Sequence, residues 1–290
     1  MNRKVYMRAE DFEAQNRELG TNLPFNQDTS SLAKPLQVGA KTIPNRLACQ
    51  AMEGCDGTPT GEPDVLTFRR YDRFAKGGAG LIWFEATAVM PEGRANPRQL
   101  CISEKNVDAF RSAVESIKET AMKTNGYEPV VIMQATHSGR YSKPEGKPAP
   151  LIAYNNPIFE GDNPIAEDRI LTDDHLDRIG EALVEGAALA QKAGFDGVDI
   201  KCCHRYLACE LLSAFTRPGK YGGSYENRTR FIKDAFAAAK AGIGDGFSYR
   251  ISFYATNYDG DKKIKYYQIH DEKGDAIWAE FYSFEVYVDG

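Results

Sequence analysis

Three polar side chains follow a short apolar segment in the second half of the chain. Residues 195–200 read Phe-Asp-Gly-Val-Asp-Ile, and Lys201, His204 and Tyr206 come shortly after them. Lysine and histidine can stabilise negative charge on a substrate oxygen, and tyrosine can supply a proton. In parallel α/β barrels, catalytic side chains lie at the carboxyl ends of the strands. We therefore expect 195–200 to be a strand that delivers these three residues to an active site.

Apolar runs and amphipathic segments alternate along the rest of the sequence. Residues 80–86 and 129–136 are almost continuously apolar, which is typical of strands buried on both faces. The pattern predicts five strands, at residues 43–52, 80–86, 129–136, 195–200 and 247–253. It also predicts four helices, at residues 63–76, 103–125, 172–194 and 224–241, of which the second is capped by Ser103 and the third by Thr172.

This alternation indicates a parallel sheet with right-handed crossovers. A doubly wound open sheet fits the same count, but the phosphate-binding fingerprint G-x-G-x-x-G does not follow the first strand. We therefore predict an α/β fold of the TIM-barrel type over residues 41–253, incomplete because it has about five βα units. Residues 1–40 are polar and form an N-terminal segment without sustained periodicity. The Pro-rich loop 141–171 is expected to shape a site or to act as a lid.

Several motifs occur in the order and at the spacing of a known family. Residues 194–207 (Gly-Phe-Asp-Gly-Val-Asp-Ile-Lys-Cys-Cys-His-Arg-Tyr-Leu) and 221–228 (Tyr-Gly-Gly-Ser-Tyr-Glu-Asn-Arg) resemble the signature of the Old Yellow Enzyme family of flavin-dependent oxidoreductases. Residues 134–140 (Gln-Ala-Thr-His-Ser-Gly-Arg) resemble that family's third strand, and Arg250 resembles the arginine of its fifth. The resemblance covers residues 34–253.

The resemblance implies that the chain binds FMN and uses NADH or NADPH as reductant. Gln134 would hydrogen-bond the pyrimidine end of the flavin, and Arg250 would stabilise the reduced ring through its positive charge. Both lie inside apolar segments, where an unpaired polar group is costly, so the flavin is their expected partner. The full set of residues expected to line or hold the flavin is Ala51, Met52, Glu53, Ala86, Gln134 and Arg250.

The same resemblance implies reduction of an activated carbon–carbon double bond. Lys201 and His204 align with the two residues that hold the electron-withdrawing oxygen of the substrate, and Tyr206 aligns with the proton donor. Hydride delivered to the β-carbon leaves negative charge on that oxygen, and an acid must then protonate the α-carbon. The expected small-molecule substrate is an enone or an enoate.

Three positions depart from the family's pattern. Lys201 replaces a histidine, Arg205 replaces a glycine, and Glu53 replaces a threonine or cysteine. A lysine can pair with a substrate carboxylate, which favours enoates. A carboxylate at position 53 would repel the anionic reduced flavin and lower its redox potential.

The resemblance stops near Phe253, where the sequence looks truncated after the fifth strand of an eight-stranded barrel. In the family, the last two strands supply the groups that hold the flavin phosphate. Residues 254–290 instead alternate polar turns with aromatic segments, an atypical tail with hairpin patterning. This tail, a second copy or a complementing chain would have to cover the open sheet edge. A non-catalytic half-barrel that no longer holds FMN is the alternative function.

Composition excludes several other classes of protein. The net charge of -5 over 290 residues argues against a nucleic-acid partner. The longest apolar run, residues 80–90, contains Glu85 and is too short to cross a membrane. Six cysteines without paired spacing, and no signal-like segment, predict a cytoplasmic protein. Cys202 and Cys203 would point to opposite faces of a strand, so we expect no metal site.

Overall fold

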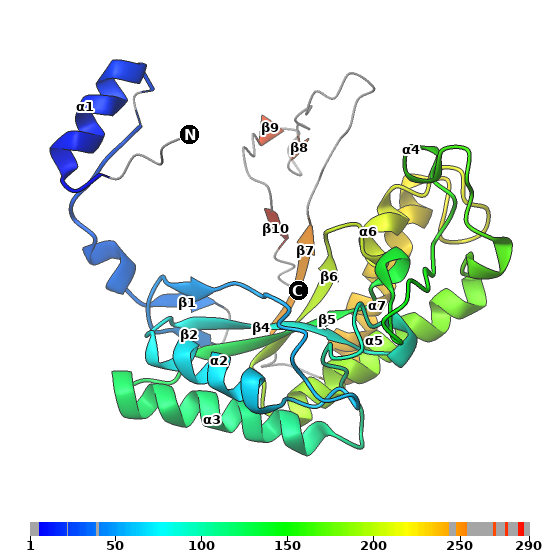
Figure 1. The fold of residues 1–290 in the computed structure, drawn as a ribbon, viewed down its shortest axis with the longest axis horizontal. Coiled ribbons are helices and arrows are strands. Elements are labelled where there is room, and N and C mark those ends of the chain that lie inside the picture. The colour runs from blue at the N-terminus through cyan, green and yellow to red at the C-terminus, as the bar shows by residue number, and fades with distance from the viewer. Residues whose placement is uncertain are drawn as a thin grey trace.

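An open mixed sheet runs through the centre of the molecule (Figure 1). The computed structural model describes residues 6–21, 23–38 and 41–243, and four strand segments at 248–253, 269–270, 276–277 and 284–286. In spatial order the strands of this sheet are β10 (Phe284–Val286), β7 (Ser248–Phe253), β6 (Gly197–Cys202), β5 (Val130–Thr136), β4 (Leu81–Ala88) and β3 (Ala48–Cys49).

The strands from β3 to β7 are parallel and neighbour one another in chain order. Strand β10 pairs with β7 in the antiparallel direction. The predicted α/β class and the five parallel strands are therefore confirmed. Within the described residues the sheet does not close into a barrel, as expected for an incomplete one.

Both faces of the central strands are buried. Every residue of β5 and β6 is buried, which accounts for their nearly continuous apolar sequence. On one face Phe84 packs against Phe110 and Phe195. On the opposite face Trp83 belongs to a smaller cluster that Ile43 helps to cover.

Four long helices supply the buried side chains that cover the Phe84 face of the sheet (Figure 1). They are α2 (Val65–Lys76), α3 (Val107–Asn125), α5 (Asp173–Lys192) and α7 (Tyr225–Ile243). Thr172 caps α5 as predicted, because its hydroxyl accepts a hydrogen bond from the N–H of His175. All four predicted helices are therefore present.

Two of the predicted helix starts are wrong by two to four residues. Asn106, not Ser103, directly precedes α3, and its side chain accepts a hydrogen bond from the N–H of Ser103. This bond holds a turn ahead of the helix. Helix α2 begins at Val65 because Asp64 caps it, which leaves Pro63 outside the helix.

The N-terminal segment has more regular structure than its composition predicts. It contains α1 (Ala9–Leu19), a 3-10 turn (Ser30–Ala33) and a hairpin of β1 (Leu36–Val38) and β2 (Lys41–Ile43). No residue of α1 is buried, so this helix has no stripe that packs into the core. The first parallel strand is shorter than predicted, because Ile43 belongs to the hairpin and Pro44 has no N–H to donate.

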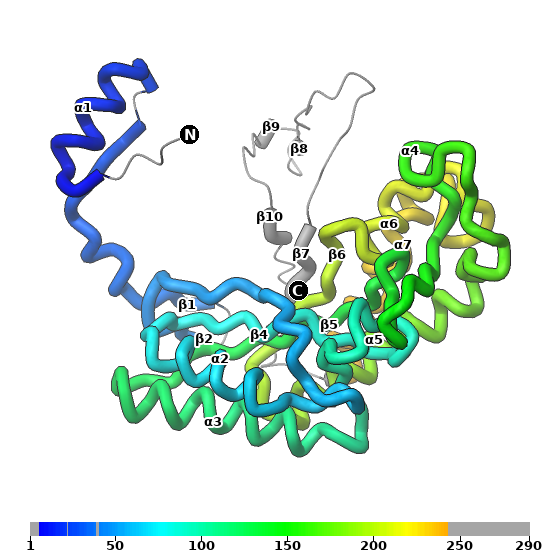
Figure 2. The backbone as a smooth tube through the Cα atoms, in the orientation of Figure 1, coloured from blue at the N-terminus to red at the C-terminus, as the bar shows by residue number. Residues whose placement is uncertain are grey.

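The segment between β5 and α5 runs far from the sheet before it returns (Figure 2). It contains α4 (Pro157–Glu160) and two 3-10 turns (Gly139–Tyr141 and Glu167–Arg169). The guanidinium of Arg140 pairs with Glu160 at 2.5 Å and with Glu210 of α6 (Leu207–Leu212) at 2.9 Å. The long loop is therefore fixed to the helix that follows β6.

The described strands beyond Phe253 agree with the predicted β-like tail. Strands β8 (Ile269–His270) and β9 (Ala276–Ile277) pair with each other, and β10 pairs with β7. The other residues of the predicted tail lie outside the described part of the chain. In the part that is described, no helix has the length and apolar character needed to cross a membrane.

Candidate active site

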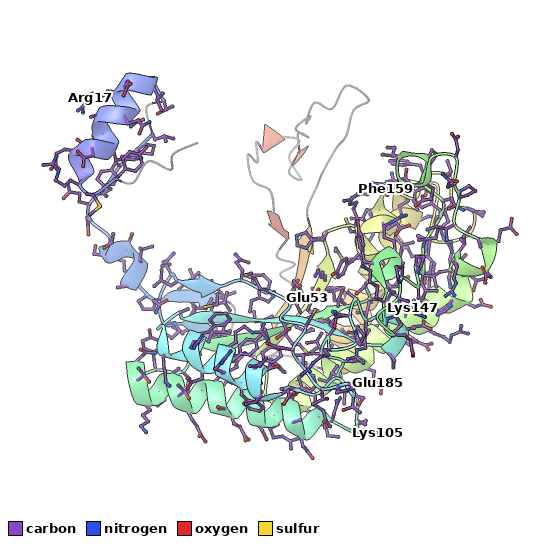
Figure 3. The ribbon with its side chains drawn as sticks, in the orientation of Figure 1. Arg17, Glu53, Lys105, Lys147, Phe159 and Glu185 are labelled. Atoms are coloured by element: carbon purple, nitrogen blue, oxygen red, sulfur yellow. The ribbon has the colours of Figure 1, made fainter. Side chains whose placement is uncertain are left out.

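Glu53, Lys201 and Tyr206 converge at the carboxyl edge of the parallel sheet. Lys201 Nζ lies 2.9 Å from Glu53 Oε1, and the Tyr206 hydroxyl donates to the same oxygen at 3.1 Å. Lys201 Nζ also lies 4.0 Å from the centroid of the Tyr206 ring. Figure 3 shows Glu53 beside the strands, well away from Lys105 in the turn before α3 and from Glu185 of α5. Two predicted catalytic residues and one predicted flavin neighbour thus form one cluster.

A tight turn after β6 sets the relative positions of Lys201 and Tyr206. Lys201 is buried within the strand itself. His204 and Arg205 have left-handed backbone conformations, with φ of 56° and 58°, and the Tyr206 N–H donates to the Cys203 carbonyl at 3.1 Å. Two successive left-handed residues that are not glycine are uncommon, and such strain is concentrated at functional sites. The turn leaves Tyr206 directly before α6.

The surroundings of Tyr206 keep its phenol protonated. Burial and the Glu53 carboxylate raise the pKa of Tyr206 far above its ordinary value. A negative neighbour that accepts the hydroxyl hydrogen bond favours the neutral phenol over the phenolate. Tyr206 therefore retains its proton at neutral pH.

His204 lies next to this cluster but is exposed. Partial burial and the nearby Lys201 cation lower the pKa of His204, while Glu53 opposes them. Its Nδ1 lies 3.8 Å from the sulfur of Cys203. The imidazole is therefore neutral at pH 7, and the cation of the cluster that Glu53, Lys201 and Tyr206 form is Lys201.

Gln134 meets a carboxylate on the neighbouring strand. Its Nε2 donates to Asp199 Oδ2 at 2.6 Å, and both side chains are buried. The amide therefore has a partner within the protein, where the sequence suggested the flavin. Ala86 is in register with Gln134, and Arg250 is in register with Asp199, so the four positions form a row across β4 to β7. The side chain of Arg250 lies outside the described part of the structure.

The loop that follows β3 carries Ala51 and Met52. Ala51 packs against the cluster that contains Trp83, whereas the Met52 side chain is 69% exposed. Arg70 Nη1 donates to the Met52 carbonyl at 3.2 Å. Small-molecule sites combine apolar surface with a few polar side chains, and the exposed Met52 beside the buried polar residues of this edge provides that combination.

Glu85 is a buried carboxylate that the sequence did not identify as part of the site. Its Oε2 accepts from the N–H of Gly54 at 2.7 Å, and its Oε1 lies 2.7 Å from Arg70 Nη2. A Cβ on residue 54 would lie 2.2 Å from that nitrogen, so any other residue there would displace the end of the Arg70 side chain. Burial raises the pKa of Glu85 to about 7, against the lowering effect of Arg70. Glu85 and Arg70 thus position Glu53 through its neighbour.

The cysteines at the end of β6 are buried thiols. Burial raises the pKa of Cys202 far above its ordinary value and that of Cys203 to about 12. Metal ligation requires the thiolate, so both are poor ligands at neutral pH. In the described residues, no group of three or more His, Cys, Asp or Glu side chains is arranged to hold a metal ion.

Comparison with known proteins agrees with this fold. The NADPH dehydrogenase of Bacillus pumilus is 30% identical over 255 residues, which are 87% of this chain and 70% of that protein. The NADPH dehydrogenase of Clostridium acetobutylicum is 32% identical over 201 residues, 68% of this chain and 56% of that protein. This chain therefore spans little more than half the length of the Clostridium protein.

A solved structure of the Old Yellow Enzyme homologue from Zymomonas mobilis is 28% identical and has a TM-score of 0.62, covering 76% of this chain and 63% of that one. The sequence profile described as the NADH:flavin oxidoreductase / NADH oxidase family matches residues 31–280. The resemblance to Old Yellow Enzymes is therefore confirmed, but the family match continues past Phe253, where the sequence analysis placed its end. This chain belongs to the NADH:flavin oxidoreductase / NADH oxidase family.

Proposed function

We propose that this chain is an FMN-dependent oxidoreductase that transfers hydride from NADH or NADPH, through the flavin, to an activated carbon–carbon double bond. The observation that carries the proposal is the convergence of Glu53, Lys201 and Tyr206 at the carboxyl edge of the sheet. A cation that can hold a substrate oxygen lies there beside a phenol that keeps its proton. The chain's membership of a flavin oxidoreductase family supports the same reaction.

The residues at this edge fit the ring of a flavin. Met52 offers exposed apolar surface, Ala86 and Gln134 are in register, and Asp199 fixes the orientation of the Gln134 amide. We propose that these residues and Ala51 hold the ring, with Arg250 on the neighbouring strand. When bound, FMN accepts hydride from the nicotinamide and passes it to the substrate. Because Lys201 pairs with Glu53, we expect a smaller lowering of the flavin potential than an unpaired carboxylate would cause.

The protein's side chains would bind the substrate oxygen and supply the proton. Lys201 and His204 would hold the oxygen of the substrate, where negative charge develops. Tyr206 would donate its phenolic proton to the carbon next to the activating group. Glu53 keeps that phenol protonated between turnovers by accepting its hydrogen bond.

The visible absorption spectrum of the purified chain tests this proposal first. We expect a flavin spectrum, with about one FMN released per chain on denaturation, and reduction of the bound flavin by NADH or NADPH. Light scattering on the same sample gives the number of chains per particle, and so tests a second copy as the cover of the open edge. A chain that stays colourless after incubation with excess FMN contradicts the proposal and favours a small-molecule-binding half-barrel without cofactor.

A further inference from the structure

Two of the departures from the family's pattern, the acidic Glu53 and the basic Lys201, form one ion pair. Glu53 and Lys201 are 148 positions apart in sequence, yet their side chains meet at 2.9 Å. The Lys201 side chain is 6% exposed and that of Glu53 is 17% exposed. At such low exposure an unpaired charge would be expensive, so each residue compensates the other.

This pairing sets the net charge of the Lys201 anchor and its immediate neighbours. Lys201 contributes one positive charge and Glu53 one negative charge, while the nearby His204 is neutral at pH 7. The guanidinium of Arg205 is directed elsewhere, since it lies 4.8 Å from the centroid of the Phe159 ring. The anchor for the substrate oxygen is therefore a hydrogen-bond donor without an excess positive charge.

A substrate carboxylate is at a disadvantage beside such an anchor. To reach Lys201 it must lose its hydration and then lie next to the Glu53 carboxylate, which already holds the ammonium. An uncharged carbonyl oxygen needs only one of the ammonium's remaining N–H donors. Its binding leaves the Glu53 pair intact.

We infer that Glu53 is a specificity-determining residue that neutralises Lys201, so that the site selects uncharged activated alkenes and rejects unsaturated carboxylates. This inference rests on the proposed function and reverses the preference for enoates that Lys201 alone suggested. It also gives Glu53 a second contact, since the same carboxylate accepts the Tyr206 hydrogen bond at 3.1 Å.

Binding of cinnamamide and of cinnamate to the full chain, as purified, tests the inference by titration calorimetry at pH 7. The two ligands have nearly the same shape and differ in charge. We expect the wild type to bind cinnamamide at least about tenfold more tightly, the smallest effect of one hydrogen bond to a charged group. Glu53→Gln should strengthen cinnamate binding by about tenfold or more, with little change for cinnamamide.

Two further variants separate charge from shape. Glu53→Gln with Lys201→Gln should lose the gain for cinnamate, because the gain requires the lysine cation. Glu185→Gln removes the same charge from an exposed position on α5 and should leave the ratio of the two affinities at its wild-type value.

Tighter binding of cinnamate than of cinnamamide by the wild type would overturn the inference. This comparison needs no mutation, so it remains decisive if Glu53→Gln folds poorly. An unchanged affinity ratio in folded Glu53→Gln overturns it as well. The flavin spectrum tests the proposed function separately. If the chain carries FMN but Glu53→Gln leaves the cinnamamide-to-cinnamate affinity ratio unchanged, only the role of Glu53 is overturned. If the chain is colourless but the affinity ratio changes as expected, the proposed enzyme activity is overturned and the role of Glu53 stands.

Discussion

Tyr206 carries its phenolic proton at neutral pH, because its environment opposes the phenolate. Burial is the main cause of the rise in the pKa of the phenol, and Glu53, which accepts its hydrogen bond, adds to that rise. Replacement by phenylalanine removes the proton but keeps the ring that Lys201 contacts. We expect Tyr206→Phe to slow reduction of the alkene by about 10²-fold or more, the usual contribution of a general acid.

Stopped-flow measurement of the two half-reactions checks this prediction. Reduction of the flavin by NADH or NADPH should keep its wild-type rate, because no proton from Tyr206 is needed there. Tyr225→Phe, at a residue 69% exposed on α7, is the matched control and should leave both rates unchanged. An alkene reduction rate in Tyr206→Phe equal to that of the wild type would show that another acid supplies the proton.

Glu85 couples the stability of the site to pH. Burial raises its pKa from 4.5 to about 7 in the folded chain, although Arg70 works in the opposite direction. The folded state therefore binds the proton more strongly than the unfolded state, and this contribution to stability is lost as the pH rises from about 4.5 to about 7. The glutamine of Glu85→Gln cannot ionise. Over this pH range, the free energy of unfolding of the variant should therefore fall less than that of the wild type, and the difference should be on the order of 3 kcal/mol.

Urea denaturation at several values between about pH 5 and about pH 8 measures the difference. The free energy of unfolding of the wild type should decline relative to that of Glu85→Gln as the pH rises. Glu115→Gln, at an exposed position of α3, should keep the wild-type slope. Parallel slopes for the wild type and Glu85→Gln would mean that Arg70 holds Glu85 ionised throughout.

At the scale of single elements, helix α5 contains two glycines with opposite surroundings. A Cβ on Gly186 would lie 2.6 Å from Cγ1 of Val89, whereas a Cβ on Gly180 would lie 3.8 Å from Phe231. Valine has little rotamer freedom, so the first contact requires a shift of backbone or helix. We expect Gly186→Ala to cost about 1 to 3 kcal/mol by overpacking. Gly180→Ala should add about 0.5 to 1 kcal/mol, because alanine loses less backbone entropy in a helix.

Urea midpoints of the two alanine variants against the wild type decide this prediction, and each variant serves as the control for the other. The propensity of alanine for helices is the same at both positions, so only the neighbours differ. Equal gains in stability at the two positions would show that Val89 gives way to the new methyl group.

The elements that could be predicted from the sequence are those whose side chains are buried in a regular pattern. Strand β5 is buried along its whole length and reads as a continuous apolar run. Helix α1 was not predicted, because none of its residues is buried in the core. The start of α3 was misplaced, because the Asn106 side chain turns the chain ahead of the helix, and propensity alone does not show this.

The candidate site could be predicted only in part, for a different reason. Motifs identified Lys201, Tyr206 and Glu53 singly, but the contact between residues 148 positions apart depends on how β3 and β6 lie within the sheet. Glu85 gave one signal, a charge that breaks an apolar run. Its role depends on an irregularity of register between Phe84 and Ala86, which no local pattern reveals.

At the scale of the whole molecule, Asp196 joins three parts of the chain at the amino edge of the sheet, opposite the candidate site. Its carboxylate lies 2.8 Å from Lys41 Nζ of the N-terminal hairpin and 3.1 Å from Lys118 Nζ of α3. It also accepts the N–H of Val131 at 2.9 Å. Burial would raise the pKa of Asp196, but these three donors lower it below its ordinary value.

The pKa of Asp196 is lower in the folded state than the ordinary aspartate pKa of about 3.9. Its contribution to stability is therefore complete above that ordinary pKa, and it is lost as the pH falls through the pKa of the folded state. We expect Asp196→Asn to cost about 1 to 3 kcal/mol at pH 7, since two lysines lose a charged partner. The deficit should shrink as urea denaturation is repeated from pH 7 down to about pH 3. Asp162→Asn, in the exposed part of the long loop, should show no deficit. A deficit that stays constant with pH would mean that Asp196 joins these parts by shape and hydrogen bonding, and that its charge contributes nothing.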